Sequence, residues 1–182
     1  SLLVTVATLT DHKGHKYLLE AMPQITRRHP RVCLALAGDG ELADSLRQRA
    51  IQLGVDANVR FLGYRDDVPD LIEAADLFVM PSHMEGLCSS LIDAMLAGRP
   101  IVTTTAGGIP DLLANDPRSE PPLAWMVPPR DPASLAEAVL EALESSDEGS
   151  RRSHQAQLRA ERQFTADCMV KATLAAYRDV LD

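Results

Sequence analysis

The stretch that decides the fold is residues 77–98, which read Leu77-Phe78-Val79-Met80-Pro81-Ser82-His83-Met84-Glu85-Gly86-Leu87-Cys88-Ser89-Ser90-Leu91-Ile92-Asp93-Ala94-Met95-Leu96-Ala97-Gly98. The stretch begins with four apolar residues, continues through a loop of small and polar residues, and ends in a segment with helical spacing of apolar side chains. A continuously apolar strand that leads into a helix is typical of a parallel strand covered on both faces. We therefore interpret these residues as one strand–loop–helix unit of an α/β sheet.

The same alternation occurs along most of the chain. The expected strands are Leu2–Leu9, Val32–Ala37, Val59–Leu62, Leu77–Met80, Ile101–Thr104 and Trp125–Val127, and the expected helices between them are Gly14–Arg28, Glu41–Leu53, Val68–Ala75 and Ser89–Ala97. This order predicts an α/β fold with a single Rossmann-like, doubly wound parallel sheet of about six strands and flanking helices. Ligands of such sheets bind outside the carboxyl ends of the strands, so the loops that follow the strands are the candidate functional loops.

After Pro132 the pattern is helical only, which predicts a helical C-terminal tail. The expected elements are helices at Pro132–Ser145, Arg151–Gln163 and Ala166–Leu181, a polar turn at Ser145–Ser150 and, further upstream, a proline-rich loop at Asn115–Pro122. Mixed charge on one face and apolar side chains on the other are typical of helices packed on the flank of a domain. We therefore interpret residues 150–182 as structural.

Composition narrows the class of protein. The 182 residues suffice for one well-cored domain, and a net charge of −8 with only 4% aromatic residues argues against nucleic-acid binding. The cysteines Cys33, Cys88 and Cys168 form no Cys-x-x-Cys pair, so we expect neither a disulfide framework nor a zinc site, and a cytoplasmic location. No apolar run approaches the ~18 residues of a transmembrane helix. Residues Ser1–Ala7 look like a core strand cut from a longer protein rather than a signal peptide.

Three glycine-containing loops are candidate ligand loops. Lys13-Gly14 offers a positive charge and unpaired N–H groups to a phosphate, with a solvated turn as the alternative. Gly38-Asp39-Gly40-Glu41-Leu42-Ala43 formally matches a dinucleotide fingerprint, but Val59–Leu62 ends without the acid that would hold a ribose, so we retain a phosphate-proximal loop and do not expect NAD. The paired Gly107-Gly108 lets the backbone pass close to a ligand or to the neighbouring loop, and both interpretations stay open.

Two carboxylates flank the loop after the strand Leu77–Met80. Gly86, Cys88 and Ser89 leave the N-terminus of the next helix open to an anion. Even a fully helical path from Glu85 to Asp93 spans at most ~12 Å, which is comparable with the span from sugar to ribose in a nucleotide-sugar. Carboxylates are good acceptors for the vicinal hydroxyls of both. The alternative roles are a helix cap for Glu85 and a solvent-facing acid for Asp93.

Taken in order, the motifs of this chain resemble the group-1 (family 4) retaining glycosyltransferases of GT-B architecture over about residues 2–145. They are Lys13-Gly14, Gly38-Asp39-Gly40, Arg60-Phe61-Leu62-Gly63-Tyr64, Ala75-Asp76, Pro81-Ser82-x-x-Glu85-Gly86, Asp93-Ala94-Met95-x-Ala97-Gly98-x-Pro100-Ile101-Val102 and Gly107-Gly108-Ile109-Pro110-Asp111. The resemblance is to the C-terminal half of those enzymes. It implies that residues 1–182 are a nucleotide-sugar-binding domain and that the N-terminal, acceptor-binding domain is absent from this chain.

The resemblance also implies roles for individual residues. Lys13 would bind the donor diphosphate, Glu85 a hydroxyl of the transferred sugar and Asp93 the ribose, with Lys13 and Glu85 as the catalytic residues. The remaining implied donor-binding residues are Thr8, Gly14, Gly38, Gly40, Arg60, Leu62, Gly63, Tyr64, Gly86, Leu87, Cys88 and Ser89. Residues 60–64 would line the base pocket, and the backbone of residues 86–88 would meet the distal phosphate.

The activity implied by the resemblance is retaining, metal-independent transfer of a hexosyl group in glycan biosynthesis. Positive side chains and N–H groups would stabilise the departing diphosphate. The donor is expected to be a UDP-sugar, with GDP- and ADP-sugars as alternatives, and neither a cofactor nor a metal is expected. The missing N-terminal domain would bind the acceptor, so the isolated chain is not expected to transfer sugar. The expected location is the cytoplasm, with a peripheral place at the inner face of a membrane as a possibility that the resemblance implies. The alternatives are a degenerate nucleotide- or partner-binding domain without catalysis and another GT-B activity, such as a sugar-nucleotide epimerase or a phosphorylase.

Three residues depart from the family pattern. Thr8 stands where the family usually has Arg, so half of an Arg/Lys diphosphate clamp is missing, although His12 can supplement Lys13 when protonated. Asp93 stands where the second acid is usually Glu, and its shorter side chain predicts a longer or water-mediated ribose contact. Cys88 stands where glycine is common. We interpret it as a small packed residue, with a reactive thiol as the alternative.

Overall fold

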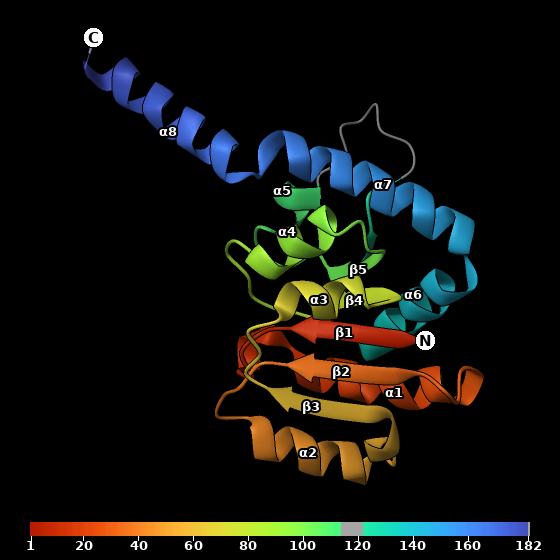
Figure 1. The fold of residues 1–182 in the computed structure, drawn as a ribbon. Coiled ribbons are helices and arrows are strands. Elements are labelled where there is room, and N and C mark those ends of the chain that lie inside the picture. Colours follow the sequence, from red (N-terminus) through yellow and green to blue (C-terminus); the bar gives the residue numbers. More distant parts are fainter. Residues whose placement is uncertain (114–121, 182) are drawn as a thin grey trace.

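The computed structural model describes residues 1–113 and 122–181, which form one α/β unit around a parallel sheet (Figure 1). Within these residues, six strands lie in the order β3-β2-β1-β4-β5-β6. The strands are β1 (Leu2–Val6), β2 (Cys33–Ala37), β3 (Val59–Gly63), β4 (Leu77–Met80), β5 (Ile101–Thr104) and β6 (Trp125–Val127). The order confirms the predicted doubly wound sheet, because the chain runs to one edge through β3 and then returns beside β1 through β4.

Helices cover both faces of the sheet. They are α1 (His15–Arg28), α2 (Ala43–Gln52), α3 (Val68–Glu73), α4 (Ser89–Leu96), α5 (Ile109–Leu113), α6 (Pro132–Glu144), α7 (Ser146–Gln163) and α8 (Ala166–Leu181), with 3₁₀ turns η1 (Asp11–Lys13) and η2 (Asp56–Asn58). Apolar side chains of α1, α2 and α6 share one core with the sheet. Those of α3, α4, α5 and α7 share a second core on the opposite face.

Strand β4 shows why the central strands are apolar without alternation. Leu77 and Val79 belong to one core, and Phe78 and Met80 belong to the other. All four side chains are buried, because successive side chains of a strand point to opposite faces and both faces are covered. The continuously apolar run Leu77–Met80 therefore indicates a central strand, and the structure confirms this prediction.

Most predicted boundaries agree with the structure to within two residues, but the first strand is shorter than predicted. It ends at Val6, not at Leu9. The reason is that Leu9 turns inward and is buried, while its N–H donates to the Asp39 carbonyl and its carbonyl accepts from Leu42. Residues 7–10 therefore belong to the loop at the carboxyl edge of the sheet.

The predicted polar turn at Ser145–Ser150 is wrong, because α7 already begins at Ser146. The acids Asp147 and Glu148 lie in the first turn of the helix, where the helix dipole favours negative charge. Gly149 is buried and packs beside Pro100 and Trp125, so a residue that reads as a turn signal is a packing residue inside a helix. The predicted loop Asn115–Pro122 lies, apart from Pro122, outside the described residues.

The expectation that the C-terminal helices pack on the flank of the domain holds for α7 but not for α8. Helix α7 lies against α4 and α6, whereas α8 meets α7 and extends away from the body (Figure 1). The exposed large apolar side chains of α8 are Met169, Val170, Leu174 and Tyr177. No helix in the described ranges combines the length and the apolar character needed to cross a membrane.

Helix α6, which packs on α1, begins at a well-made N-cap. Asp131 Oδ1 accepts hydrogen bonds from the N–H groups of Ala133 at 3.1 Å and Ser134 at 3.0 Å. Its Oδ2 accepts from Ser134 Oγ at 2.7 Å. These bonds, the one from the Ser134 hydroxyl above all, hold the pKa of the Asp131 carboxyl below its ordinary value of 3.8.

Because the pKa of Asp131 is lowered by folding, the ionised cap stabilises the protein above pH 3.8 and loses its effect as the pH falls through the lowered pKa. We expect Asp131→Ala to lower the Tm by ~3 °C at pH 7, and the difference to shrink as the pH falls towards 3. Asp131→Asn keeps an acceptor for the cap and should melt close to the wild type at pH 7. A difference between wild type and Asp131→Ala that stays constant from pH 7 to 3 would contradict this role.

Gly14 allows the start of α1 to touch the end of β4. Its φ is +70°, and a Cβ at this position would lie 2.0 Å from the Pro81 carbonyl oxygen. Gly54 also has a left-handed φ, of +67°, but a Cβ there would meet no atom within 4 Å. A substitution at Gly54 therefore tests backbone strain alone, whereas the same substitution at Gly14 adds a steric clash.

We expect Gly54→Ala to reduce the free energy of unfolding by about 1 kcal/mol, from left-handed strain alone. Gly14→Ala adds a clash with a backbone oxygen and should cost more than about 2 kcal/mol. Urea unfolding of both variants measures the difference. Equal losses would show that the approach of Gly14 to Pro81 is not needed.

Candidate functional site

The loops after β1, β4 and β5 contact one another at the carboxyl edge of the sheet. The carbonyl of His12 accepts hydrogen bonds from the N–H groups of His83 at 2.9 Å and Met84 at 3.3 Å. On the other side, a Cβ at Gly107 would lie 1.8 Å from the Glu85 carbonyl oxygen, and the Gly108 N–H donates to that oxygen at 3.2 Å. The paired glycines therefore serve the approach of a neighbouring loop, one of the two interpretations that the sequence leaves open.

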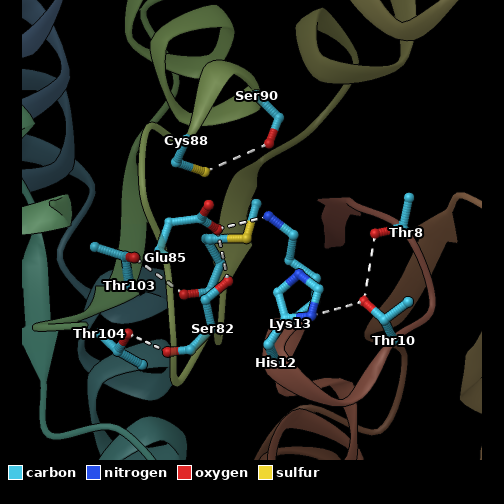
Figure 2. A network of polar contacts seen from close by, with 11 residues as sticks. Thr8, Thr10, His12, Lys13, Ser82, Glu85, Cys88, Ser90, Thr103 and Thr104 are labelled. Carbon is cyan, nitrogen blue, oxygen red and sulfur yellow. Dashed lines mark hydrogen bonds and ion pairs between the residues drawn. The ribbon is translucent and has the colours of Figure 1, made fainter. Parts of the chain in front are cut away.

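A partly buried ion pair joins the first two of these loops. Lys13 Nζ lies 2.7 Å from Glu85 Oε2, and the side chains are only 17% and 6% exposed. Ser82, which is fully buried, donates its hydroxyl to the same Oε2 at 3.1 Å (Figure 2). The main chain of Ser82 is fixed in turn, because its carbonyl accepts a hydrogen bond from Thr104 Oγ1. Glu85 is thus held in one orientation.

Beside this ion pair lies a cavity of about 430 Å³ at the carboxyl ends of β1 and β2. Loops after β3 and β4 and the first turns of α4 complete it. The lining residues are Val6, Ala7, Thr8, Lys13, Ala37, Gly38, Asp39, Tyr64, Arg65, Val68, Leu87, Cys88, Ser89, Ser90 and Asp93. The sequence-predicted residues that the fold brings together here are Thr8, Lys13, Gly38, Tyr64, Leu87, Cys88, Ser89 and Asp93.

The cavity combines apolar walls with a few polar groups of both signs, as small-molecule sites commonly do. Lys13 and Arg65 contribute positive charge, and Asp39 and Asp93 contribute carboxylates. Helix α4 begins at Ser89 with no acid in its first turn, so its unpaired N–H groups favour an anion at this end of the cavity. Burial raises the pKa of Asp93 above its ordinary value of 3.8.

Cys88 behaves as a packed side chain rather than as a nucleophile. It is buried at the N-cap of α4, with its Sγ 3.7 Å from Ser90 Oγ. Burial raises the pKa of its thiol above the ordinary value of 9.0. A raised pKa keeps the thiol protonated at neutral pH, which argues against the alternative of a reactive cysteine.

Arg60 is one predicted residue that the fold does not bring to the cavity. Its guanidinium donates to the carbonyls of Ala57 and Val59, both at 3.0 Å, at the amino end of β3. Because ligands of a parallel sheet bind at the carboxyl ends, this placement removes Arg60 from the base pocket in which we expected it.

The remaining predicted residues lie near the cavity without lining it. Gly14 and Gly40 act through backbone packing, since a Cβ at Gly40 would lie 2.6 Å from the Leu9 carbonyl oxygen. Leu62 and Gly63 end β3, next to Tyr64, which does line the cavity. Glu85 and Gly86 belong to the loop beside the cavity, and Glu85 is tied to it through Lys13.

Three polar residues at the site, Asp39, Arg65 and Ser82, are not among those predicted from the sequence. Asp39 and Arg65 line the cavity, and Arg65 Nε donates to Asp67 Oδ1 at 2.7 Å. Ser82 holds Glu85 although only its place after Pro81 in the motif marks it in the sequence. Over residues 1–113 and 122–181, no three His, Cys, Asp or Glu side chains are grouped as a metal site would require.

Comparison with known proteins identifies the family. The family described as "Glycosyl transferases group 1" matches residues 1–145. An uncharacterized glycosyltransferase of Methanocaldococcus jannaschii is 32% identical over 185 residues, which cover 100% of this chain and 45% of the relative. A glycogen synthase of Mycobacterium tuberculosis is also 32% identical, over 96% of this chain and 42% of the relative. The chain therefore spans less than half the length of these curated relatives.

Solved structures agree with the sequence relatives. Anabaena HepE, crystallised with UDP, superposes with a TM-score of 0.85 at 26% identity, over 96% of this chain and 48% of that one. WaaG, a glycosyltransferase involved in lipopolysaccharide biosynthesis, superposes with a TM-score of 0.82 at 26% identity, over 94% of this chain and 45% of that one. The neighbours are GT-B glycosyltransferases, and the chain corresponds to a C-terminal-like half of them. With its doubly wound sheet and this cavity, the chain belongs to the group 1 glycosyltransferases.

Proposed function

We propose that residues 1–182 form the nucleotide-sugar-binding domain of a retaining, metal-independent glycosyltransferase whose acceptor is bound by a second domain. The observation that carries the proposal is the partly buried Lys13–Glu85 pair, which lies beside a cavity that opens on the N-terminus of α4. A cation, a row of free N–H groups and a fixed carboxylate are the groups that a sugar diphosphate requires.

In this proposal each part of the nucleotide-sugar donor contacts a different group of residues in or beside the cavity. The diphosphate lies between Lys13 and the N-terminus of α4, and the sugar hydroxyls reach Glu85. The nucleoside extends towards Gly38 and Tyr64, at the ends of β2 and β3, with its ribose at Asp93. Supporting this order, Lys13 lies at the Glu85 side of the cavity, whereas the ends of β2 and β3 lie at the far side of the sheet.

Catalysis then depends on charge that develops on the departing diphosphate. Once the donor is bound, Lys13 and the α4 N–H groups lie against the diphosphate, so they stabilise this charge without further reorganisation. Retention, independence of metal and a role in glycan biosynthesis belong to the proposal, as do the cytoplasmic location and a peripheral place at a membrane, to which the second domain would bind.

Relatives support the choice of a donor to propose. HepE has been crystallised with UDP-glucose, and a mannosyltransferase of Corynebacterium glutamicum, 31% identical over 75% of this chain and 36% of its own length, is described as GDP-mannose-dependent. We propose a UDP-sugar as the donor, with GDP- and ADP-sugars as the competitors to test beside it.

Calorimetric titration with UDP and UDP-glucose tests the placement of Lys13 and Glu85. Lys13→Ala removes a charge-assisted contact to phosphate and should weaken UDP binding by at least about tenfold. Glu85→Gln should leave UDP binding largely intact but weaken UDP-glucose, because only the sugar contacts Glu85. Lys16→Ala is the matched control, since Lys16 pairs with exposed Asp11 outside the cavity and should leave both affinities unchanged.

Two results would contradict the proposed function. If the wild-type chain binds no UDP-, GDP- or ADP-sugar at millimolar concentration, a degenerate domain without donor binding replaces it. If the isolated chain transfers sugar at a measurable rate, the acceptor is not bound by a second domain.

Thr8 lines the cavity at a position where the resemblance implies an arginine. We expect Thr8→Arg to tighten UDP binding by about three- to tenfold, because a second cation can share the diphosphate charge with Lys13. Thr173→Arg adds the same charge on α8, away from the cavity, and serves as the control. Equal effects of the two variants in the titration would indicate a nonspecific effect of net charge.

A further inference from the structure

We propose that Ser82 is a positioning residue that holds the Glu85 carboxylate in place when the donor diphosphate draws Lys13 away. The inference rests on the proposed function and names a residue that contacts neither phosphate nor sugar. Its basis is that Lys13 and Ser82 donate to the same oxygen of Glu85, at 2.7 Å and 3.1 Å (Figure 2). In the absence of a ligand, Lys13 and Ser82 therefore both hold the Glu85 carboxylate.

The second oxygen of Glu85 is the one available to a sugar. Among the described residues, both of its polar partners bind Oε2 and none binds Oε1. A carboxylate that is held through one oxygen presents the other in a fixed direction, as recognition of a sugar hydroxyl requires. Ser82 and Lys13 thus determine where Oε1 points.

Binding of the nucleotide-sugar changes how Glu85 is held, because it affects the hydrogen bond from Lys13 and not the one from Ser82. The Lys13 ammonium is a point charge on a flexible stem, and it turns readily towards a phosphate group that carries more negative charge than Glu85. The Glu85 side chain is 6% exposed, so little water can replace a lost hydrogen bond. A buried carboxylate with an unfilled partner is costly, and the Ser82 hydroxyl is the protein donor that remains.

Ser82 is well placed for this task because its side chain is buried and its main chain is hydrogen-bonded to β5. It is fully buried directly after β4, and the Thr104 hydroxyl on β5 donates to its carbonyl. The preceding residue, Pro81, packs against Gly14 at the start of α1. The Ser82 hydroxyl therefore projects from a buried, hydrogen-bonded position in the loop after β4, whereas Lys13, at the end of η1, carries its ammonium on a flexible stem.

A double-mutant cycle between Ser82→Ala and Glu85→Gln, titrated with UDP and with UDP-glucose, tests this inference. Ser82→Ala should leave UDP affinity within about twofold of wild type and weaken UDP-glucose by about tenfold, as expected for the loss of a buried hydrogen bond to a charged group. In the Glu85→Gln chain the same substitution should have little further effect, because Ser82 acts only through Glu85. Ser82→Thr keeps the hydroxyl and should restore UDP-glucose binding.

The matched control is Thr103→Val. Thr103 is also fully buried, on the neighbouring strand, and its hydroxyl donates to the Met80 carbonyl at 3.0 Å without touching Glu85. Thr103→Val should lower the Tm about as much as Ser82→Ala does, without changing the ratio of the affinities for UDP and UDP-glucose. An equal change of that ratio in Thr103→Val would reduce Ser82 to a structural residue.

The outcomes separate the two proposals. A wild-type chain that binds neither ligand would overturn the proposed function and this inference with it. A wild-type chain whose UDP-glucose affinity depends on Glu85, but is unchanged in Ser82→Ala, would overturn the inference alone. Additive effects of Ser82→Ala and Glu85→Gln would do the same.

Discussion

The site depends on one constraint of topology, the position of β1 between β2 and β4. The chain passes from β1 to one side of the sheet and later returns on the other, so the loops after β1 and β4 leave in opposite directions and open a crevice between them. Backbone contacts keep this crevice narrow at one end, where Gly14 meets Pro81 and the His12 carbonyl accepts from His83. The Lys13–Glu85 pair spans this end, and the cavity extends from Lys13 to residues at the ends of β2 and β3.

The electrostatics of the site are local and do not follow the net charge of the chain. The protein carries a charge of −8, yet Lys13 and the N-terminus of α4 meet at a point with no acid in the first helical turn. Lys13 and Arg65 line the cavity together with the carboxylates of Asp39 and Asp93, so placed charges and N–H dipoles at close range decide where an anion binds. An acidic domain can therefore bind an anionic ligand. In the absence of that ligand, Glu85 holds the Lys13 ammonium.

Hydrophobic periodicity predicts the central strands, but it predicts neither the start of α7 nor the direction of the Arg60 side chain. Continuously apolar runs such as Leu77–Met80 predict central strands because both faces of the sheet are covered, and this strand has the predicted bounds. Ser145–Ser150 was misread because serine, aspartate and glycine are turn residues by local preference, whereas Gly149 is buried against Pro100 and Trp125 within α7. Arg60 was misplaced because its motif lies on β3 but its guanidinium turns back towards the amino end of the strand.

The sequence by itself determined the α/β class, most of the strands and helices, and the loops that carry Lys13 and Glu85, because these follow from hydrophobic period and from motifs within single segments. Tertiary structure alone decided that Lys13 and Ser82 meet the same oxygen of Glu85, that Asp39 and Arg65 line the cavity, and that Gly107 packs on the loop of Glu85. Most of these contacts join segments that are distant in sequence. Their distances depend on strand order and loop packing, which no local pattern encodes.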